Sequence, residues 1–341
     1  LIGVLSPNSI AQKWIDFLKN DPSVLVLTEN TANLVEESFI DMIDTFLTPI
    51  EKRNLQELLQ PDVLISVGGM VISKKIKEFL RKYPPKVHYY IDEHVGYDTF
   101  FSLTHHFKTD INTFLSKVTE ELPPITFSYK EIWLSLYKET LKKRNNYLEN
   151  IPFSDMKVYE AIFSHIPTPY HIQISNSAAI RYAQLFHSKA GWQIFCNRGT
   201  SGIDGSTSTA IGASIVQKLP TLLITGDLSF FYNSNALWCN YIPKNFKIIL
   251  VNNSGGGIFR ILPTDKETPF FETFQETVHN LTAKHLCAMF GFTYLSAEST
   301  EEISSLLESF FYEKGTPCLL EIFTPRKLND TVLKNYFNTL V

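Results

Sequence analysis

The stretch TLLITGDLSFFYNSNALWCNYIPKNFKIILVNNSGGG, residues 221–257, decides the fold. It contains two short β-rich apolar runs, Thr221–Thr225 and Lys247–Val251, with a helical stretch at Ser234–Asn240 between them. A strand, a helix and a second strand in this order predict parallel strands joined by a crossover. The stretch therefore predicts an α/β fold with a doubly wound parallel sheet.

The same alternation continues on both sides of this stretch and predicts a domain over residues 154–341. Its other expected strands are His171–Ser175, Gln193–Cys196, Thr293–Leu295 and Cys318–Phe323. Its other expected helices are Val158–His165, Thr207–Gln217, Leu281–Phe290 and Glu301–Glu313.

A second, Rossmann-like α/β domain with its own doubly wound parallel sheet is expected over residues 1–122. Its expected strands are Leu1–Leu5, Val24–Leu27, Val63–Val67 and Val87–Ile91, with helices at Ile10–Leu18 and Lys74–Lys82. Pro123 and Pro124 interrupt the chain, and a charged helix at Lys130–Glu149 follows them. We therefore expect a linker and helix over residues 123–153.

Composition excludes several classes of protein. The 341 residues are 44% hydrophobic with a net charge of -4, and no basic stripe for nucleic acid is present. No apolar run reaches the length of a membrane span, and the first residues lack the pattern of a signal peptide. The four cysteines share no metal-type spacing, so we expect free thiols in a reducing cytosol.

Polar residues follow the two strands of the opening stretch. Asp227 comes after the first strand and Asn253 after the second, so neighbouring strands would bring them together at one edge of the sheet. A carboxylate, an amide oxygen and a freed carbonyl are ligands that suit Mg²⁺. Gly255 and Gly256 would let the backbone approach a diphosphate and donate amides to it, and a helix after Ser229 would add its dipole. Either motif alone is usually only a turn; the pair predicts a metal–diphosphate site.

This pair resembles the Gly-Asp-Gly…Asn-Asn signature of thiamine diphosphate enzymes. The resemblance implies bound thiamine diphosphate with Mg²⁺ or Mn²⁺, and it implies that Asp227, Asn253 and the carbonyl of Gly255 are the metal ligands. Leu228 stands where that signature has its second glycine, and this departure narrows the choice of family.

Three further segments resemble the synthases that make 2-succinyl-5-enolpyruvyl-6-hydroxy-3-cyclohexene-1-carboxylate in menaquinone biosynthesis, the MenD family. The segments are Asn176–Arg181, Asn197–Gly205 and Asn253–Phe259 with Leu262-Pro263 beyond. The resemblance covers the second domain and is faint in the first. It implies a cytoplasmic, homodimeric or homotetrameric transferase that joins 2-oxoglutarate to isochorismate with loss of CO₂, without nucleic acid or membrane partners.

The resemblance also implies roles for individual residues. The implied substrate-binding residues are Ser177, Arg181, Arg198, Ile258, Phe259, Leu262, Lys74 and Lys75. The implied cofactor-binding residues are Ser201, Gly202, Ile203, Gly226, Asp227, Leu228, Ser229, Asn253, Gly255 and Gly256. Arginine suits carboxylate substrates because its planar fork binds them in bidentate fashion. The simpler interpretations are core packing for the apolar residues and a solvated helix face for the two lysines.

No catalytic residue is expected in this chain. The family places its activating glutamate on a pyrimidine-binding domain that precedes the two domains expected here, and the Glu36-Glu37 pair is better explained as solvated helix charge. The first domain resembles the middle domain of three. We therefore expect the chain to be a fragment that cannot turn over alone.

Alternatives remain open at this point. Another thiamine-dependent 2-oxo acid decarboxylase or acetohydroxyacid synthase would share the metal site but would not need both Arg181 and Arg198. A non-catalytic protein that keeps the fold is a second alternative, which the intact metal ligands disfavour. A nicotinamide dehydrogenase is disfavoured because neither sheet begins with a Gly-x-Gly-x-x-Gly turn.

Overall fold

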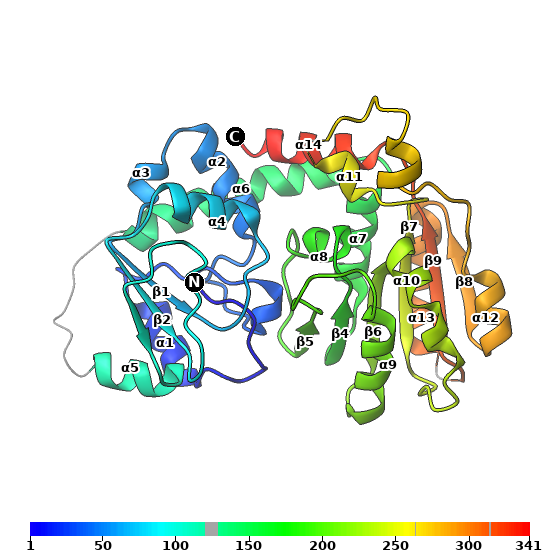
Figure 1. The fold of residues 1–341 in the computed structure, drawn as a ribbon, viewed down its shortest axis with the longest axis horizontal. Helices are drawn as coiled ribbons and strands as arrows, with labels where there is room; N and C mark the ends of the chain where they lie inside the picture. Colours follow the sequence, from blue (N-terminus) through cyan, green and yellow to red (C-terminus); the bar gives the residue numbers. More distant parts are fainter. Residues whose placement is uncertain (120–128, 263, 314) are drawn as a thin grey trace. The chain divides into compact units, whose positions relative to one another are not determined.

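The computed structural model describes residues 1–119, 129–262, 264–313 and 315–341. They form two compact units, Leu1–Asn146 with Thr339–Val341 and Tyr147–Asn338 (Figure 1). The prediction of a separate linker and helix over 123–153 is wrong for most of helix α6, Tyr129–Glu149. This helix belongs to the first unit, because its Trp133 and Tyr137 are buried in the core of that unit. Pro123 and Pro124 lie outside the described residues.

The first unit contains a three-stranded parallel sheet in the order β1-β2-β3. Its strands are β1 Val63–Val67, β2 Val87–Ile91 and β3 His105–Phe107. Its helices are α1 Gln12–Asn20, η1 Asn30–Ala32, α2 Ile43–Lys52, α3 Gln56–Leu59, α4 Lys74–Lys82, α5 Ile111–Thr119 and the larger part of α6 Tyr129–Glu149.

Two predicted strands of this unit, Leu1–Leu5 and Val24–Leu27, are wrong as regular strands. Only Ile2 pairs on both sides, through single parallel bridges to Thr28 and Val67. The backbone crosses closely at this point, since a Cβ on Gly3 would lie 2.1 Å from the carbonyl oxygen of Gly69. The segments extend the sheet beyond β1, but they pair over too short a length to form a ladder.

Helices cover both faces of the first sheet. One apolar cluster joins α2, α4 and α6 with Leu64 of β1. A separate cluster joins α1 and α5 with Val67 and Ile91. Successive residues of a strand point to opposite faces of the sheet, so Leu64 packs in the first cluster and Val67 in the second. This arrangement is the predicted doubly wound α/β fold.

The second unit contains a six-stranded, all-parallel sheet in the order β5-β4-β6-β7-β9-β8. Its strands are β4 Tyr170–Ile174, β5 Trp192–Phe195, β6 Thr221–Gly226, β7 Lys247–Asn252, β8 Thr293–Ala297 and β9 Cys318–Phe323. Its helices are α7 Asp155–His165, α8 Ala178–Ala183, α9 Ser206–Val216, α10 Asp227–Tyr232, η2 Ser234–Trp238, α11 Ile258–Ile261, η3 Phe271–Gln275, α12 Lys284–Phe290, α13 Thr300–Tyr312 and α14 Asn329–Thr339.

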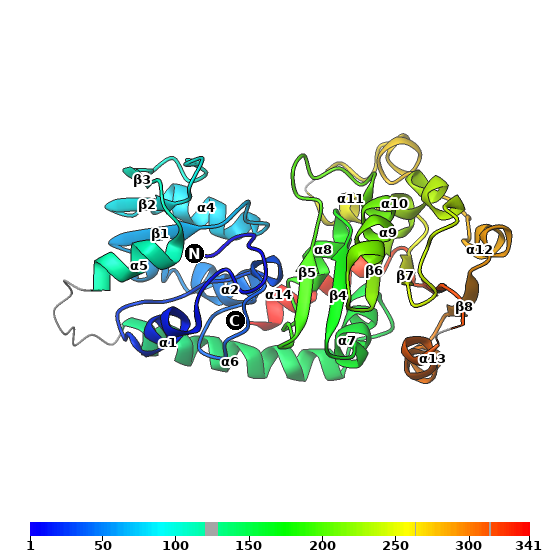
Figure 2. The same cartoon turned by 90° about the horizontal axis from the view of Figure 1, so that it is seen from below.

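The central strands β6 and β7 are buried except at Gly226, as parallel strands covered on both faces must be. On one face, α9, α10, η2 and α12 share a cluster with Leu223, Ile248 and Leu250. On the other face α7 and α13 lie against each other (Figure 2). The sheet is therefore doubly wound as well.

Most predicted elements of both units are confirmed within one to three residues. The elements Val63–Val67, Lys74–Lys82, Val87–Ile91 and Cys318–Phe323 begin and end where predicted. The expected helix at 234–240 is a short 3₁₀ turn, η2. Sequence patterns missed β3, α2, α3, α5, α8, α11 and α14, and the short turns η1 and η3.

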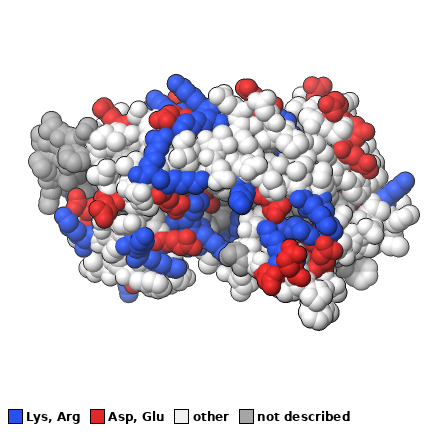
Figure 3. Space-filling model, turned by 90° about the horizontal axis from the view of Figure 1, so that it is seen from above, with Lys and Arg blue, Asp and Glu red and all other residues white. Residues whose placement is uncertain are grey.

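The surface carries mixed charge. Figure 3 shows Lys and Arg side chains interspersed with Asp and Glu over the face that it draws of each unit. No helix of the described residues has the length and apolarity that crossing a membrane requires. All four cysteines are free thiols, and burial raises the pKa of Cys287 to about 12.

Candidate functional site

The sheet of the second unit changes its direction of winding between β4 and β6. The chain passes from β4 outward to β5 and then back across to β6, on the opposite side of β4. Ligands of open α/β sheets bind at the carboxyl ends of strands beside such a switch point. The predicted site segments follow β4, β5, β6 and β7, which are four adjacent strands. The topology therefore gathers them at one edge.

Asp227 is tied to the loop after the neighbouring strand. It begins α10 directly after β6, so the predicted helix start after Ser229 is wrong by three residues. One carboxylate oxygen accepts the Leu228 amide at 2.7 Å, and the other accepts the Gly255 amide at 3.0 Å. β6 and β7 pair with Gly226 opposite Val251. The predicted convergence of the two loops is thus confirmed.

The two asparagines after β7 have different surroundings. The Asn252 side chain is fully engaged: it donates to the Leu281 carbonyl and the Glu321 carboxylate and accepts the Ser254 amide. The Asn253 side chain donates from Nδ2 to Asp155 at 2.9 Å. Its carbonyl oxygen, Oδ1, is buried and has no hydrogen-bond partner. Asn252 therefore stabilises the loop, and Asn253 presents an unused oxygen.

Asp155 is a residue of this site that the sequence did not reveal. It begins α7, is buried, and accepts hydrogen bonds from Asn253 at 2.9 Å and from the Thr324 hydroxyl at 2.6 Å. Burial raises the pKa of Asp155 to about 6; these two hydrogen bonds oppose the rise, and the Asp227 carboxylate adds to it. Two buried carboxylates, Asp155 and Asp227, thus interact with each other, and the first of them holds the NH₂ group of Asn253.

His279 is a second residue that the sequence did not reveal. Its Nε2 lies 3.3 Å from the Asp227 carboxylate, although the geometry is not that of a hydrogen bond. Its Nδ1 accepts the Leu281 amide at 3.1 Å, which leaves the proton of a neutral ring on Nε2. A lone histidine in a loop carries no pattern that assigns it to a site.

The unused oxygen of Asn253 is the test of whether the site fits a metal ion. A buried polar atom without a partner costs free energy unless something binds it. A divalent cation bound by this oxygen and by the Asp227 carboxylate would give the oxygen a partner. It would also neutralise part of the negative charge of the carboxylate. The carbonyl of Gly255 accepts the Gly257 amide at 3.0 Å and keeps a second lone pair. These residues fit a hard cation.

The glycine amides correct one prediction. We expected them to donate to a diphosphate, but each one is already engaged within the protein. The Gly255 amide donates to Asp227, the Gly256 amide to the Glu276 carbonyl at 2.5 Å, and the Gly257 amide to the Gly255 carbonyl. Gly255 has φ +150°, and a Cβ there would lie 2.7 Å from the Glu276 carbonyl oxygen. The glycines allow close backbone packing instead.

A buried ion-pair cluster braces this glycine loop. The Glu276 carboxylate is fully buried and accepts two hydrogen bonds from Arg260, each at 2.5 Å, and one from Arg326 at 3.1 Å. Glu272 pairs with the same two arginines at 3.3 Å but is half exposed. The cluster therefore fixes the segment around Glu276, whose backbone carbonyl accepts the Gly256 amide.

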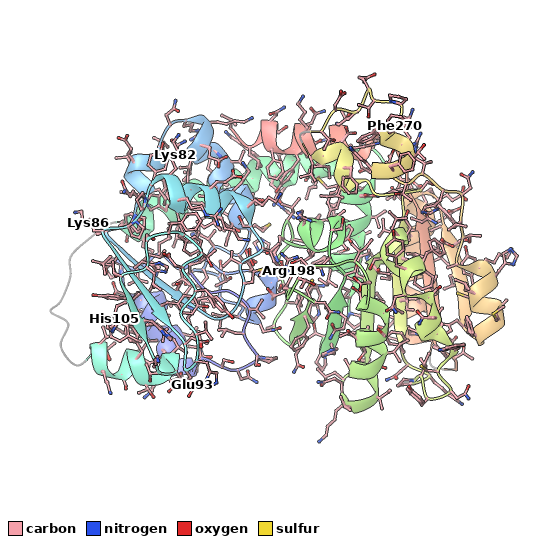
Figure 4. The ribbon with its side chains drawn as sticks, viewed as in Figure 1. Lys82, Lys86, Glu93, His105, Arg198 and Phe270 are labelled. Carbon is pink, nitrogen blue, oxygen red and sulfur yellow. The ribbon has the colours of Figure 1, made fainter. Side chains whose placement is uncertain are left out.

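Arg181 and Arg198 come from adjacent strand ends. Nη1 of Arg181 donates to the Ser177 carbonyl at 2.7 Å, and Nη1 of Arg198 donates to the Asn176 side chain at 2.7 Å. Both guanidinium groups lower the pKa of Cys196, although burial outweighs them and raises it to about 12. The predicted substrate arginines therefore lie near the same thiol (Arg198 is labelled in Figure 4).

Arg198 has unused binding capacity. Its Nε is buried and has no hydrogen-bond partner. A guanidinium with one edge held by the protein and a donor left unused is suited to an anionic ligand. Ser177, whose carbonyl accepts Arg181, has φ +68°. Ser201 and Ser254 share this left-handed region, and such strain in non-glycine residues is concentrated at functional sites.

The predicted cofactor loop after β5 is joined to α10. The Ser229 hydroxyl donates to the carbonyl of Ile203 at 2.5 Å, and Ile203 is half-buried. The Gly202 carbonyl accepts the Asn176 side chain at 2.7 Å. Ser201 donates to the Arg198 carbonyl at 3.4 Å. These contacts join the loop after β5 to α10 and to Asn176, and the cofactor-binding role of these residues stays a prediction.

The predicted apolar residues lie on the short helix α11 and just beyond it. Ile258 is buried, whereas Phe259 and Leu262 are half-buried. A Cβ on Gly256 would lie 3.0 Å from the Phe259 ring, so the ring packs on the glycine loop. These positions suit a pocket wall or simple packing.

Lys74 and Lys75 belong to the first unit. Ser73 caps their helix as predicted, by accepting the Ile76 amide at 3.1 Å. The helix start is already occupied by a carboxyl group, because Glu29 accepts the amides of Ile72 and Ser73. Lys75 pairs with Glu51 at 2.5 Å, whereas Lys74 is exposed. Their predicted role in substrate binding stays a prediction.

Comparison with known proteins assigns this geometry to a class. Residues 177–322 match the family described as thiamine pyrophosphate enzyme, C-terminal TPP binding domain, where thiamine pyrophosphate is another name for thiamine diphosphate. The match contains the ends of β5, β6 and β7. It does not contain the end of β4 or the start of α7 at Asp155. The second unit is therefore of the class of thiamine diphosphate-binding domains.

Similarity to individual proteins extends over the whole chain. It is 51% identical over 340 residues to 2-succinyl-5-enolpyruvyl-6-hydroxy-3-cyclohexene-1-carboxylate synthase of Flavobacterium psychrophilum, which covers 100% of this chain and 62% of that protein. It is 38% identical over 326 residues to the synthase of the same name from Porphyromonas gingivalis, covering 93% and 56%. The chain is thus similar to these synthases over 93% to 100% of its own length and spans between 56% and 62% of theirs.

Proposed function

We propose that this chain supplies the diphosphate and metal-binding part of a thiamine diphosphate-dependent carboligase. In the complete protein, the reaction joins 2-oxoglutarate to isochorismate, with release of CO₂, to give 2-succinyl-5-enolpyruvyl-6-hydroxy-3-cyclohexene-1-carboxylate. The observation that carries the proposal is the buried, unpartnered Oδ1 of Asn253, which follows β7, together with the Asp227 carboxylate at the tip of the adjacent strand β6. The similarity to these synthases and the pair Arg181 and Arg198 support the choice of reaction.

The roles of the residues follow from their chemistry. Asp227, Asn253 and the carbonyl of Gly255 would hold Mg²⁺ or Mn²⁺, which would bind the diphosphate. Thiamine diphosphate, when bound, supplies the carbanion chemistry at the 2-oxo group. Arg198 and Arg181 would bind substrate carboxylates, since a partly buried guanidinium forms strong, directed hydrogen bonds with them.

The remaining assignments rest on the family resemblance. Ser177 would donate to a substrate carboxylate or hydroxyl, and Ile203 would support the bent cofactor. Ile258, Phe259 and Leu262 would form the apolar wall of the substrate pocket. The activating glutamate would come from a pyrimidine-binding domain of the complete protein, so we propose that these 341 residues alone do not turn over.

The proposed reaction is tested by assaying the complete protein with 2-oxoglutarate, with and without isochorismate, in the presence of Mg²⁺ and thiamine diphosphate. Product formation that requires both substrates supports the proposal. Turnover of pyruvate but not of 2-oxoglutarate would instead indicate a different thiamine-dependent decarboxylase or an acetohydroxyacid synthase. Binding of cofactor and metal without turnover of either substrate would indicate a non-catalytic protein that keeps the fold.

A further inference from the structure

We propose that Asp155 is a positioning residue for the metal site, which turns the Asn253 amide so that its oxygen, and not its NH₂ group, faces the cation. The proposal rests on the proposed function, since it assumes that Asn253 binds a metal ion. It concerns a residue at the start of α7, far in sequence from every predicted ligand.

The contacts of Asp155 are directed at the site and not at its own helix. Ser154 precedes the helix without a side-chain cap, and no contact of the Asp155 carboxylate with its own helix amides is found among the described residues. One carboxylate oxygen accepts Nδ2 of Asn253, and the other accepts the hydroxyl of Thr324, which follows β9. The Asp155 amide donates to Asn329 at 2.8 Å, which fixes the start of the helix.

The chemistry of these contacts sets the orientation of the Asn253 amide. An ionised carboxylate only accepts hydrogen bonds, so it selects the NH₂ end of the amide. The carbonyl oxygen must then point away from Asp155, and it is this oxygen that is buried and unpartnered. Only the oxygen can coordinate a hard cation such as Mg²⁺. An amide free to rotate would present the wrong group part of the time.

A merely structural role for Asp155 would have a different consequence. If Asp155 only held α7 to β9, then losing its hydrogen bond to Thr324 would reduce Mn²⁺ affinity as much as losing its hydrogen bond to Asn253. Thr324→Val removes the first bond and leaves the second. Asp155→Leu removes both. The two variants therefore separate general loosening of the fold from loss of amide orientation.

The experiment is titration of the complete protein with Mn²⁺ in the presence of thiamine diphosphate, followed by electron paramagnetic resonance. Asp155→Leu is expected to weaken Mn²⁺ binding by about 10- to 100-fold, as is typical when a group that orients a ligand is lost. Thr324→Val is expected to lower the melting temperature but to change Mn²⁺ affinity by less than about threefold. Equal Mn²⁺ affinity in wild type and Asp155→Leu would overturn the inference while leaving the proposed site intact.

An exchange of the two side chains covers the case in which Asp155→Leu does not fold. Asn253→Asp alone places two carboxylates against each other and is expected to weaken Mn²⁺ binding strongly. Adding Asp155→Asn restores a donor–acceptor pair, so the double variant is expected to bind Mn²⁺ at least about tenfold more tightly than Asn253→Asp alone. No gain in the double variant would overturn the inference. Failure of the wild type to bind Mn²⁺ would overturn the proposed function itself.

Discussion

The side-chain oxygen of Asn176 accepts a hydrogen bond from Nη1 of Arg198 at 2.7 Å and so joins the loops after β4 and β5. The NH₂ group of the same amide donates to the carbonyls of Asn197 and Gly202, at 2.6 and 2.7 Å. Asn176 is buried. One side chain therefore positions both a predicted substrate cation and a predicted cofactor loop.

Replacing Asn176 with Leu should loosen Arg198 and lower stability. Each buried polar group left without a partner costs about 1–3 kcal/mol. We expect a lower melting temperature and, in the complete protein, a KM for 2-oxoglutarate that rises more than kcat falls. Asn240→Leu, at an exposed asparagine of the same unit, is the control and should leave KM unchanged. A folded Asn176→Leu protein with wild-type KM would contradict this role.

Gly255→Ala should disturb the glycine loop. Its φ of +150° is outside the range of other residues, and the new Cβ would meet the Glu276 carbonyl oxygen at 2.7 Å. Strain of this kind costs about 1–3 kcal/mol, and the shift of the loop should weaken Mn²⁺ binding as well. Chemical denaturation and Mn²⁺ titration measure the two effects.

Gly212 offers a matched control for this substitution. It lies within α9, where a Cβ would meet nothing within 4 Å. Gly212→Ala should raise the free energy of unfolding by about 0.5–1 kcal/mol, because alanine loses less backbone entropy in a helix. Equal destabilisation by the two substitutions would show that the position of Gly255 is not special.

Glu276→Gln should destabilise the second unit by about 3 kcal/mol, the lower end of the range for breaking a buried pair, because both arginines keep some contact with water. Glu272→Gln removes a carboxylate that pairs with the same Arg260 and Arg326 but is half exposed. It should change the melting temperature little. Similar losses in both variants, measured by urea unfolding, would contradict a special role for the buried carboxylate.

The first unit should lose stability as pH rises, through Glu29. Burial raises the pKa of this carboxyl to about 7, against the hydrogen bonds from the Ile72 and Ser73 amides. A carboxyl with a raised folded-state pKa binds its proton more tightly in the folded protein. The stability that this proton binding adds to the folded protein is therefore complete below the unfolded-state pKa of 4.5. It is lost as pH rises toward the folded-state pKa of about 7.

Glu29→Gln tests this pH dependence. The variant cannot ionise at this position, so its free energy of unfolding relative to wild type should increase between about pH 4.5 and pH 7. Urea unfolding across this range measures the difference. A difference between the two proteins that stays constant with pH would contradict the raised pKa.

Local patterns were enough to predict much of the fold and of the site. β1 and β9 are short apolar runs bounded by polar residues or proline, and α4 has a serine cap and apolar residues at helical spacing. The convergence of Asp227 and Asn253 followed from one crossover unit, because consecutive parallel strands end at the same edge. These features depend only on nearby residues.

Features that depend on distant residues were not predictable in this way. Asp155 and Asn253 are 98 residues apart, and their contact exists only because α7 begins beside the tip of β7. The glycine amides were expected to be available, but Glu276 takes one of them from a segment with no recognisable pattern. Leu1–Leu5 has a strand-like composition, yet only Ile2 finds partners on both sides.

The most direct measurement is a crystal structure of the complete protein with Mg²⁺ and thiamine diphosphate bound. We expect the ion about 2.1 Å from Oδ1 of Asn253 and from a carboxylate oxygen of Asp227, with Nδ2 of Asn253 still donating to Asp155. An ion bound elsewhere, or an Asn253 whose NH₂ group faces it while its oxygen contacts Asp155, would contradict the proposed metal site.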